Sequence, residues 1–420
     1  MQDKRYVSVH RVLTTQIMDL LDEFPDRDIL RKIESYKSAL TNYDFSTITI
    51  KDYPIEVACE VFSRINTGGM ALTVFEIMVA KTYDEAKKFD LAEKYEVLRD
   101  GSDEDRECLT GAKFETVPEA IIMQCVSAIT QRAVRSRDIL KIRRDVFIAN
   151  WEPMKASLFM AIDFIRSELR VPVSQLMPYP AILVPLTYFF HAVGNRKPRN
   201  EQVRFLEQFF YWVGLTQRYS SATESKLADD FNRMDSIIKS EMPSYQSTEL
   251  TIDARAIEET WFSAGNAYCK AILCLLAYLQ PKSFDTNGVV ILDNSNLKIA
   301  SSRNYHHFFP KAYLEKNGNG RQPNMIANIT LLDGYSNKHR IGAKAPSDYI
   351  GKFGKDNPAI AETLKTHLIR DVGAYGVSND DYDAFLRNRA RAIALALNVK
   401  LLSLTHVQAA EAESQPCLPQ

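Results

Sequence analysis

The sequence predicts a mainly α-helical protein whose C-terminal third has a different, strand-containing character. Between residues 115 and 240, apolar residues recur at the 3.6-residue spacing of helices. After residue 281, short β-type runs and turn residues replace that spacing. The 420 residues, of which 45% are hydrophobic and 25% charged, have the composition of an ordinary globular protein of two or three domains.

The N-terminal part alternates helical and strand-like patterns. Residues 11–42 are predicted to form two helices, and the alternating run STITIKDY at 46–53 a strand. Another helix leads into RINTGG at 64–69, where paired glycines interrupt the periodicity and permit positive φ. Helical periodicity resumes at 72–86, and an acidic surface loop is expected at 97–107.

The C-terminal third begins after a Pro/Ser-containing joint at 241–251 and a last helix pair at 255–280. GVVILD at 288–293 and NLKIA at 296–300 are predicted as short strands. A turn at the adjacent histidines, a loop and a short helix are expected next. Two further helices and a frayed tail complete the chain.

Composition excludes several classes of protein. Lys plus Arg number 52 and Asp plus Glu 53, so no global charge draws the chain to nucleic acid or membrane. The longest apolar run, nine residues at 271–279, is far short of the ~20 that span a bilayer. The N-terminus lacks an apolar signal core, and the six cysteines form no C-x-x-C pair. We therefore expect a cytoplasmic protein without disulfides or structural zinc.

Chemistry concentrates in one C-terminal region. Three of the seven histidines, His306, His307 and His339, lie within 34 residues, with Asn328 and Asn337 between them. Residues 281–353 carry ten Lys/Arg and five Asp/Glu, an excess of +5 in a chain of net charge −1. A local positive field around clustered imidazoles suits a polyanionic substrate held beside a metal ion.

On residue chemistry alone, two interpretations of the adjacent histidines stay open. At a turn, both side chains can converge on one site, where one binds a metal and the other acts as a base. The alternative is that His306 and His307 are partly buried polar residues whose hydrogen bonds go to the backbone.

Longer stretches of sequence carry a family resemblance. HHFFPKAYL, followed by NMIANITLLDGYSNKHRIGAKAPSDYI, resembles the divergent form of the HNH (ββα-metal) nuclease core. The wider chain resembles GmrSD-type, modification-dependent (type IV) restriction endonucleases. The stretches that carry this second resemblance are FSRINTGGMALTVFEIMVAK, RYSSATESKLADDF, APSDYI and DYDAFLRNRA. The resemblance implies a C-terminal ββα-metal nuclease domain.

The resemblance also implies roles for individual residues. His307 would be the general base, because an imidazole with a pKa near ~6.5 can take a proton from water at neutral pH. His306, where Asp or Glu is commoner, and Asn337 would bind the metal, and Asn328 would brace the loop and orient His307. The expected ion is Mg²⁺ or Mn²⁺, although imidazole suits softer metals better.

Asn337 and His339 compete for the last ligand position. If YSNKHRIG enters a short helix, each residue turns by about 100°, so positions 337 and 339 lie ~200° apart and cannot both face the ion. The resemblance places Asn337 there, which leaves His339 to contact phosphate. The residues expected to bind DNA are Lys311, Lys338, His339, Arg340, Lys344, Arg387 and Arg389.

The N-terminal part departs from the family. The family's ParB/sulfiredoxin-like NTPase domain carries a Q-R-x-Y-x-W-like stretch and a D-G-Q-Q-R signature, and neither occurs here. We therefore expect an N-terminally truncated relative. Asn66, Thr67, Gly68 and Gly69 would line the remnant of a nucleotide pocket or would simply form a helix-ending turn. The missing signatures argue against NTP use by this chain.

These inferences define the expected organisation and function. The domains are a ParB/sulfiredoxin-like remnant (1–100), a helical domain (101–254), an HNH-type nuclease domain (255–408) and a disordered tail (409–420). The expected function is metal-dependent hydrolysis of DNA, restricting phage DNA that bears modified bases. The alternatives are a non-catalytic or regulatory DNA- or partner-binding remnant, and a ribonuclease, because this site does not itself read the 2′-hydroxyl. Membrane binding is not expected, and homo-oligomerisation stays open.

Overall fold

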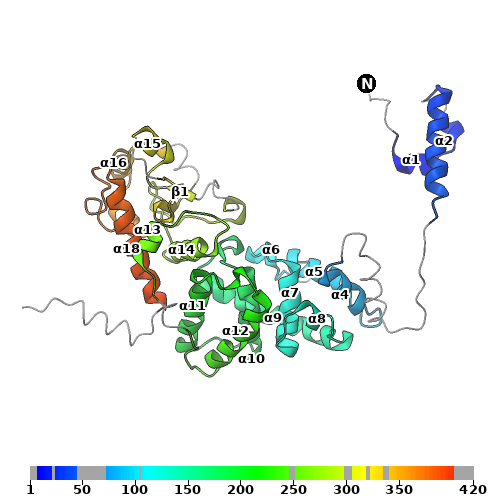
Figure 1. The fold of residues 1–420 in the computed structure, drawn as a ribbon, viewed down its shortest axis with the longest axis horizontal. Helices are drawn as coiled ribbons and strands as arrows, with labels where there is room; N and C mark the ends of the chain where they lie inside the picture. The colour runs from blue at the N-terminus through cyan, green and yellow to red at the C-terminus, as the bar shows by residue number, and fades with distance from the viewer. Residues whose placement is uncertain are drawn as a thin grey trace, which may run out of the picture. The chain divides into compact units, whose positions relative to one another are not determined.

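The chain divides into two units, and the described residues of each are mainly helical. A computed structural model describes residues 7–20, 24–44, 72–103, 106–245, 251–297, 305–317, 322–333 and 340–401. By their internal contacts, the two units are Met1–Arg64 and Ile65–Gln420. The predominance of helices confirms the predicted mainly α class (Figure 1).

The first unit contains the helices predicted at 11–42. They are α1 (Val9–Thr14), the 3-10 helix η1 (Ile17–Leu20) and α2 (Arg27–Thr41). The Asp26 side chain caps α2 by accepting a hydrogen bond from the Asp28 amide. Leu20, Phe24 and Leu30 form its small buried core. The strand predicted at 46–53 and the RINTGG turn lie outside the described residues.

The second unit begins with an array of helices. Helix α4 starts with a capping box, in which Thr73 and Glu76 satisfy each other's backbone amides. Helix α5 extends to Asp100, so the loop expected at 97–107 begins only at Gly101, whose φ of 83° ends the helix. The array consists of α4 (Val74–Thr82), α5 (Leu91–Asp100), α6 (Leu109–Ala112), α7 (Glu119–Gln131), α8 (Ser136–Ile139), α9 (Arg144–Ser167), η3 (Ser174–Leu176), η4 (Pro180–Ile182), α10 (Leu183–Ala192), α11 (Asn200–Leu215), η5 (Arg218–Ser220) and α12 (Thr223–Ile238).

The rest of the second unit combines helices with two short strands. After β2 the described residues form three helices, where the sequence predicts a short helix at YSNKHRIG, mostly outside the described residues, and two further helices. The elements are α13 (Ala254–Glu258), α14 (Ala267–Tyr278), η7 (Asn294–Asn296), β1 (Tyr305–His307), α15 (Lys311–Lys316), η8 (Ile326–Asn328), β2 (Ile329–Leu331), α16 (Pro346–Asp356), α17 (Ile360–Lys365) and α18 (Tyr382–Leu401). Among the helices described, none has the length and apolar character needed to cross a bilayer.

The two strands pair antiparallel, and the turn expected at the histidine pair is wrong. Tyr305 lies opposite Leu331, and His307 opposite Ile329, so both histidines belong to β1. In 288–293, where the sequence predicts a strand, Val289 forms only an isolated bridge with Lys282. An apolar run that lacks a long partner strand cannot extend this bridge into a ladder.

The helical array and the C-terminal elements share one hydrophobic core. Helix α11 packs against α14 and α18, and buried residues from Met78 to Leu401 form a single cluster. Gly214 of α11 permits this approach, because a Cβ there would lie 2.9 Å from the Ala271 Cβ of α14. This division differs from the expected boundaries at 100 and 254, since α4 also packs against α7 and α9.

A buried histidine lies in this shared core behind the strands. His367 is 1% exposed, and its Nε2 donates a hydrogen bond to the Lys282 carbonyl at 2.8 Å. Its ring meets that of Phe284 edge to face, with 4.9 Å between centroids. Burial lowers the pKa of His367 from 6.5 to about 4, although the bond to Lys282 opposes this shift. The imidazole is therefore neutral in the folded protein at pH 7.

The buried His367 should make stability depend on pH. The unfolded chain takes up this proton near pH 6.5 and the folded chain near pH 4, so stability present above pH 6.5 is lost as pH falls toward 4. We expect His367 to account for a loss of about 3 kcal/mol in the free energy of unfolding over this range. Urea unfolding of wild type and His367→Phe at several pH values measures this loss. The phenylalanine keeps a ring but cannot titrate. Equal losses in both proteins would contradict the assignment.

Candidate active site

The candidate site is built on β1, where the two histidines point to opposite faces. Tyr305 and His307 share one face of the strand, and His306 lies on the other. The packing agrees with this alternation. The Tyr305 ring contacts the Phe262 ring at 5.0 Å between centroids, whereas the His306 ring faces Tyr349 at 6.4 Å. The expected convergence of both imidazoles on one site is therefore absent.

His306 lies among aromatic side chains in the core. It is 2% exposed, and its ring lies 6.5 Å from that of Phe284 and 6.4 Å from that of Tyr349. A metal ligand needs an imidazole nitrogen directed at a shared ion, together with other donor groups. The structure thus places the imidazole that the resemblance implies as a metal ligand on the buried face of β1.

The described parts of the chain contain no other cluster suited to a metal. Within those parts, no three His, Cys, Asp or Glu side chains lie together in a way that could hold an ion. Asn337, the second expected ligand, lies outside the described residues, as do Lys338 and His339. The nucleotide-pocket candidates Asn66, Thr67, Gly68 and Gly69 also lie outside them.

His307 is held by an asparagine that the sequence analysis did not single out. The Asn324 Oδ1 lies 3.0 Å from His307 Nε2, and the Asn324 Nδ2 donates to the Phe262 carbonyl at 2.9 Å. A carbonyl only accepts, so the amide must direct its NH₂ to Phe262 and its oxygen to the imidazole. His307 Nε2 therefore carries the proton, and Nδ1 is the basic nitrogen.

The surroundings of His307 favour its neutral form. Burial lowers the pKa of His307 below 6.5, and the nearby Lys311 charge lowers it further. The hydrogen bond to Asn324 acts in the opposite direction but does not reverse the shift. At pH 7 the imidazole is therefore neutral, the state that a general base requires.

Asn328 braces the loop after His307, as expected, but it does not itself orient the imidazole. Its Oδ1 accepts from the Phe309 amide at 2.8 Å, and its Nδ2 donates to the carbonyls of Phe309 and Pro323 at 3.0 and 2.9 Å. The expected orienting role belongs to Asn324. Both asparagines stand in NMIANITLL, and residue type alone could not tell which of them faces the histidine.

A short extended segment covers this face of β1. The Phe262 amide donates to the Asn324 carbonyl at 2.8 Å, and the Ile326 amide to the Thr260 carbonyl at 2.9 Å. These bonds flank the bridge between Trp261 and Met325, so Phe262 is buried while Trp261 is 54% exposed. The segment fixes the backbone on which Asn324 is carried.

The basic residues expected to bind DNA differ in their availability. Lys311 and Arg387 are exposed. Arg340 is bound to the carboxylates of Asp285 and Asp356, and Lys344 is exposed but donates to the Arg340 carbonyl at 2.6 Å. Arg340 and Lys344 therefore already make polar contacts within the protein.

Arg389 cannot make the expected phosphate contact. It is 0% exposed, and its guanidinium donates to the carbonyls of His367 and Ala327. The prediction of DNA binding by Arg389 is wrong because the residue faces the core side of α18, which sequence charge alone does not reveal.

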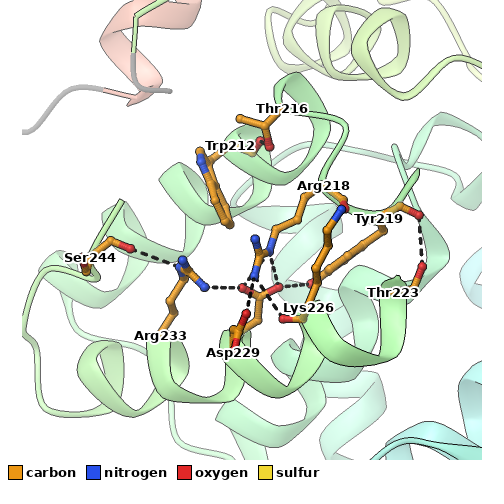
Figure 2. Close-up of polar contacts among 10 residues, drawn as sticks. Trp212, Thr216, Arg218, Tyr219, Thr223, Lys226, Asp229, Arg233 and Ser244 are labelled. Atoms are coloured by element: carbon orange, nitrogen blue, oxygen red, sulfur yellow. Dashed lines mark hydrogen bonds and ion pairs between the residues drawn. The ribbon is translucent and has the colours of Figure 1, made fainter. Parts of the chain in front are cut away.

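A second polar cluster lies in the stretch RYSSATESKLADDF, far from β1 in the sequence. Asp230 is 0% exposed, accepts from Arg218 Nε at 2.9 and 3.0 Å and from the Tyr219 hydroxyl at 2.7 Å, and is bound by Arg233 Nη1 at 2.9 Å. Figure 2 shows the two guanidinium groups converging beside Trp212. Their Cζ atoms lie 4.7 and 4.8 Å from its ring centroid.

This cluster joins η5 to α12 in the core. Burial raises the pKa of Asp230, and Arg218, Tyr219 and Arg233 oppose that shift by favouring the carboxylate. Arg218 also donates to the Lys226 carbonyl at 3.1 Å, and Arg233 to the Ser244 carbonyl at 3.2 Å. Because the Asp230 carboxylate is fully hydrogen-bonded to these side chains, we interpret the cluster as a structural network.

Removing the charge of Asp230 should destabilise the fold strongly. Asp230→Asn leaves two largely buried arginines without their counter-charge, and we expect a loss of about 3 kcal/mol or more in the free energy of unfolding. Asp229→Asn is the matched control, because that side chain is 71% exposed and lies 3.8 Å from Arg218. It should stay within about 0.5 kcal/mol of wild type. Equal losses in the two variants, measured by denaturant titration, would contradict the structural role.

Comparison with known proteins leaves the family open. No family model matches the chain. The chain is similar to an uncharacterized protein, MJ0686, of Methanocaldococcus jannaschii, with 22% identity over 380 residues. The similarity covers 85% of this chain and 61% of that protein, so the chain spans less than two thirds of the relative's length.

Proposed function

We propose that this chain is a DNA endonuclease of the HNH type in which His307 is the general base. The observation that carries the proposal is the hydrogen bond between His307 and Asn324. Because Nε2 carries the proton in this hydrogen bond, Nδ1 is unprotonated and can accept a proton. The resemblance of the surrounding segment to the ββα-metal core supports the same reading. As part of this proposal, the enzyme acts in the cytoplasm and restricts phage DNA with modified bases.

The proposed chemistry needs one proton transfer at His307. Nδ1 takes a proton from water, whose oxygen attacks the phosphorus while one P–O bond breaks. The leaving oxygen takes up a proton from solvent, and the imidazolium returns its proton to solvent. The amide of Asn324 keeps the imidazole in the required tautomer, and the Lys311 charge, which is paired with Glu315 at 3.7 Å, favours the neutral base. Positioned bases of this kind typically contribute 10²–10⁴-fold.

Dependence on Mg²⁺ or Mn²⁺ is also proposed, from the resemblance alone. A divalent ion would neutralise the scissile phosphate. We derive no step through a metal, and its proposed ligands stay those that the resemblance implies, His306 and Asn337. NTP use is not part of the proposal.

A second candidate is a DNA- or partner-binding remnant that has lost cleavage. The burial of His306 on the face opposite His307 favours this candidate specifically. It predicts that the chain retains binding but shows no turnover under any metal or nucleotide condition.

Nicking of supercoiled plasmid by purified protein separates the two candidates. We expect nicking with Mg²⁺ or Mn²⁺, its loss in EDTA, no stimulation by NTPs, and a fall of at least about 10²-fold in His307→Ala. Unchanged nicking in His307→Ala would contradict His307 as the general base. DNA binding without nicking in wild type would support the remnant, and preferential cleavage of a matched RNA would reassign the substrate.

The rate should depend on pH through His307. Because its pKa is lowered, the acidic limb of the kcat/KM profile should have its midpoint below 6.5. Asn324→Asp should move that limb upward, since a carboxylate bonded to Nε2 favours the imidazolium. Asn317→Asp is the control, because Asn317 is an exposed residue at the end of α15. Identical profiles for wild type and Asn324→Asp would exclude His307 as the titrating base.

A further inference from the structure

A buried arginine lies behind the candidate site and takes no part in the proposed chemistry. Arg389 of α18 is 0% exposed, and its guanidinium lies 5.9 Å from the Phe385 ring centroid. Among the described residues, no Asp or Glu forms an ion pair with it, and its Nη2 is buried without a hydrogen-bond partner. Burying an unpaired guanidinium is costly, so its presence calls for a role beyond filling space.

The hydrogen bonds of Arg389 end on two backbone carbonyls. Nη1 donates to the Ala327 carbonyl at 2.6 Å, and Nε donates to the His367 carbonyl at 3.1 Å. The rigid, planar guanidinium therefore connects η8, directly before β2, to the segment that follows α17. A flexible ammonium could not hold both carbonyls in the same fixed geometry.

The Ala327 carbonyl belongs to the same peptide group as the Asn328 amide. That amide donates to the Met325 carbonyl at 2.8 Å, so Arg389 and Met325 hold the two ends of one peptide plane. The plane sets where the Asn328 side chain points. Asn328 in turn holds Phe309, two residues after His307, and Pro323, next to Asn324.

We propose that Arg389 is a positioning residue for His307. It fixes the peptide between Ala327 and Asn328, and Asn328 then holds both the loop that follows His307 and the segment that carries Asn324. The desolvation that lowers the pKa of Arg389 to about 9 is consistent with a charge kept in the core. A test by plasmid nicking rests on the proposed function, whereas a test by the pKa of the His307 imidazole does not.

The test measures His307 directly. Exchange of the imidazole C2 hydrogen with deuterium across pH, followed by mass spectrometry with peptide fragmentation between His306 and His307, gives the pKa of each of these adjacent histidines separately. Arg389→Met removes the donors, Arg389→Lys keeps the charge, and Arg255→Met is the control, since Arg255 is an exposed arginine paired with Glu259 on α13. Thermal unfolding of all variants shows whether they are folded.

The expected result is a displaced His307 in folded protein. In Arg389→Met the pKa of His307 should rise toward 6.5 as the ring loosens, with Arg389→Lys intermediate and Arg255→Met unchanged. Plasmid nicking should lose roughly 10-fold to 100-fold in kcat at nearly constant KM. The double variant Arg389→Met/Asn328→Ala should shift His307 no further than Asn328→Ala alone, because both act through one path.

Several results would overturn the proposal. An unchanged pKa of His307 in folded Arg389→Met excludes positioning, and additive shifts in the double variant exclude the path through Asn328. If both Arg389→Met and Arg389→Lys unfold, Arg389 serves general stability and the positioning role is wrong. If wild type never nicks plasmid but His307 shifts as expected, the proposed function fails while the positioning role stands.

Discussion

The buried amide of Asn328 is the interaction on which the arrangement of the candidate site depends. Its side chain holds Phe309 and Pro323 at the same time, so the segments before and after α15 are joined at one residue. Because a buried amide that loses a partner retains its desolvation cost, few other geometries of these loops are comparably stable. The approach of Asn324 to His307 follows from this closure.

The site is also tied to the rest of the second unit through its core. Helix α18 contacts α13, η8 and α11, so it connects η8, directly before β2, to the helical array. Gly214 permits α11 to lie close to α14, which extends the same core. A local change in the array can therefore affect the strands through packing, because close-packed cores transmit displacement rather than absorb it.

Charge counted along the sequence differs from charge available at the surface. The +5 excess of residues 281–353 includes Arg340, whose guanidinium is bound by Asp285 and Asp356. Arg389, outside that range, is fully buried. Lys311 remains exposed near His307, where its charge acts on the imidazole. The electrostatic field at His307 thus depends on the few cations that lie near it, such as Lys311, and not on the charge summed over the segment.

Four features could be predicted from the amino-acid sequence: the mainly helical class, the two helices at 11–42, the array at 115–240 and the region in which the histidines lie. Helical periodicity and capping residues act over a few positions, so such features can be read locally. The tertiary structure decided that His306 and His307 face opposite sides of β1, that Asn324 rather than Asn328 holds the imidazole, and that Arg389 is buried. These outcomes depend on strand register and on contacts between residues far apart in sequence, and residue type and spacing do not encode them.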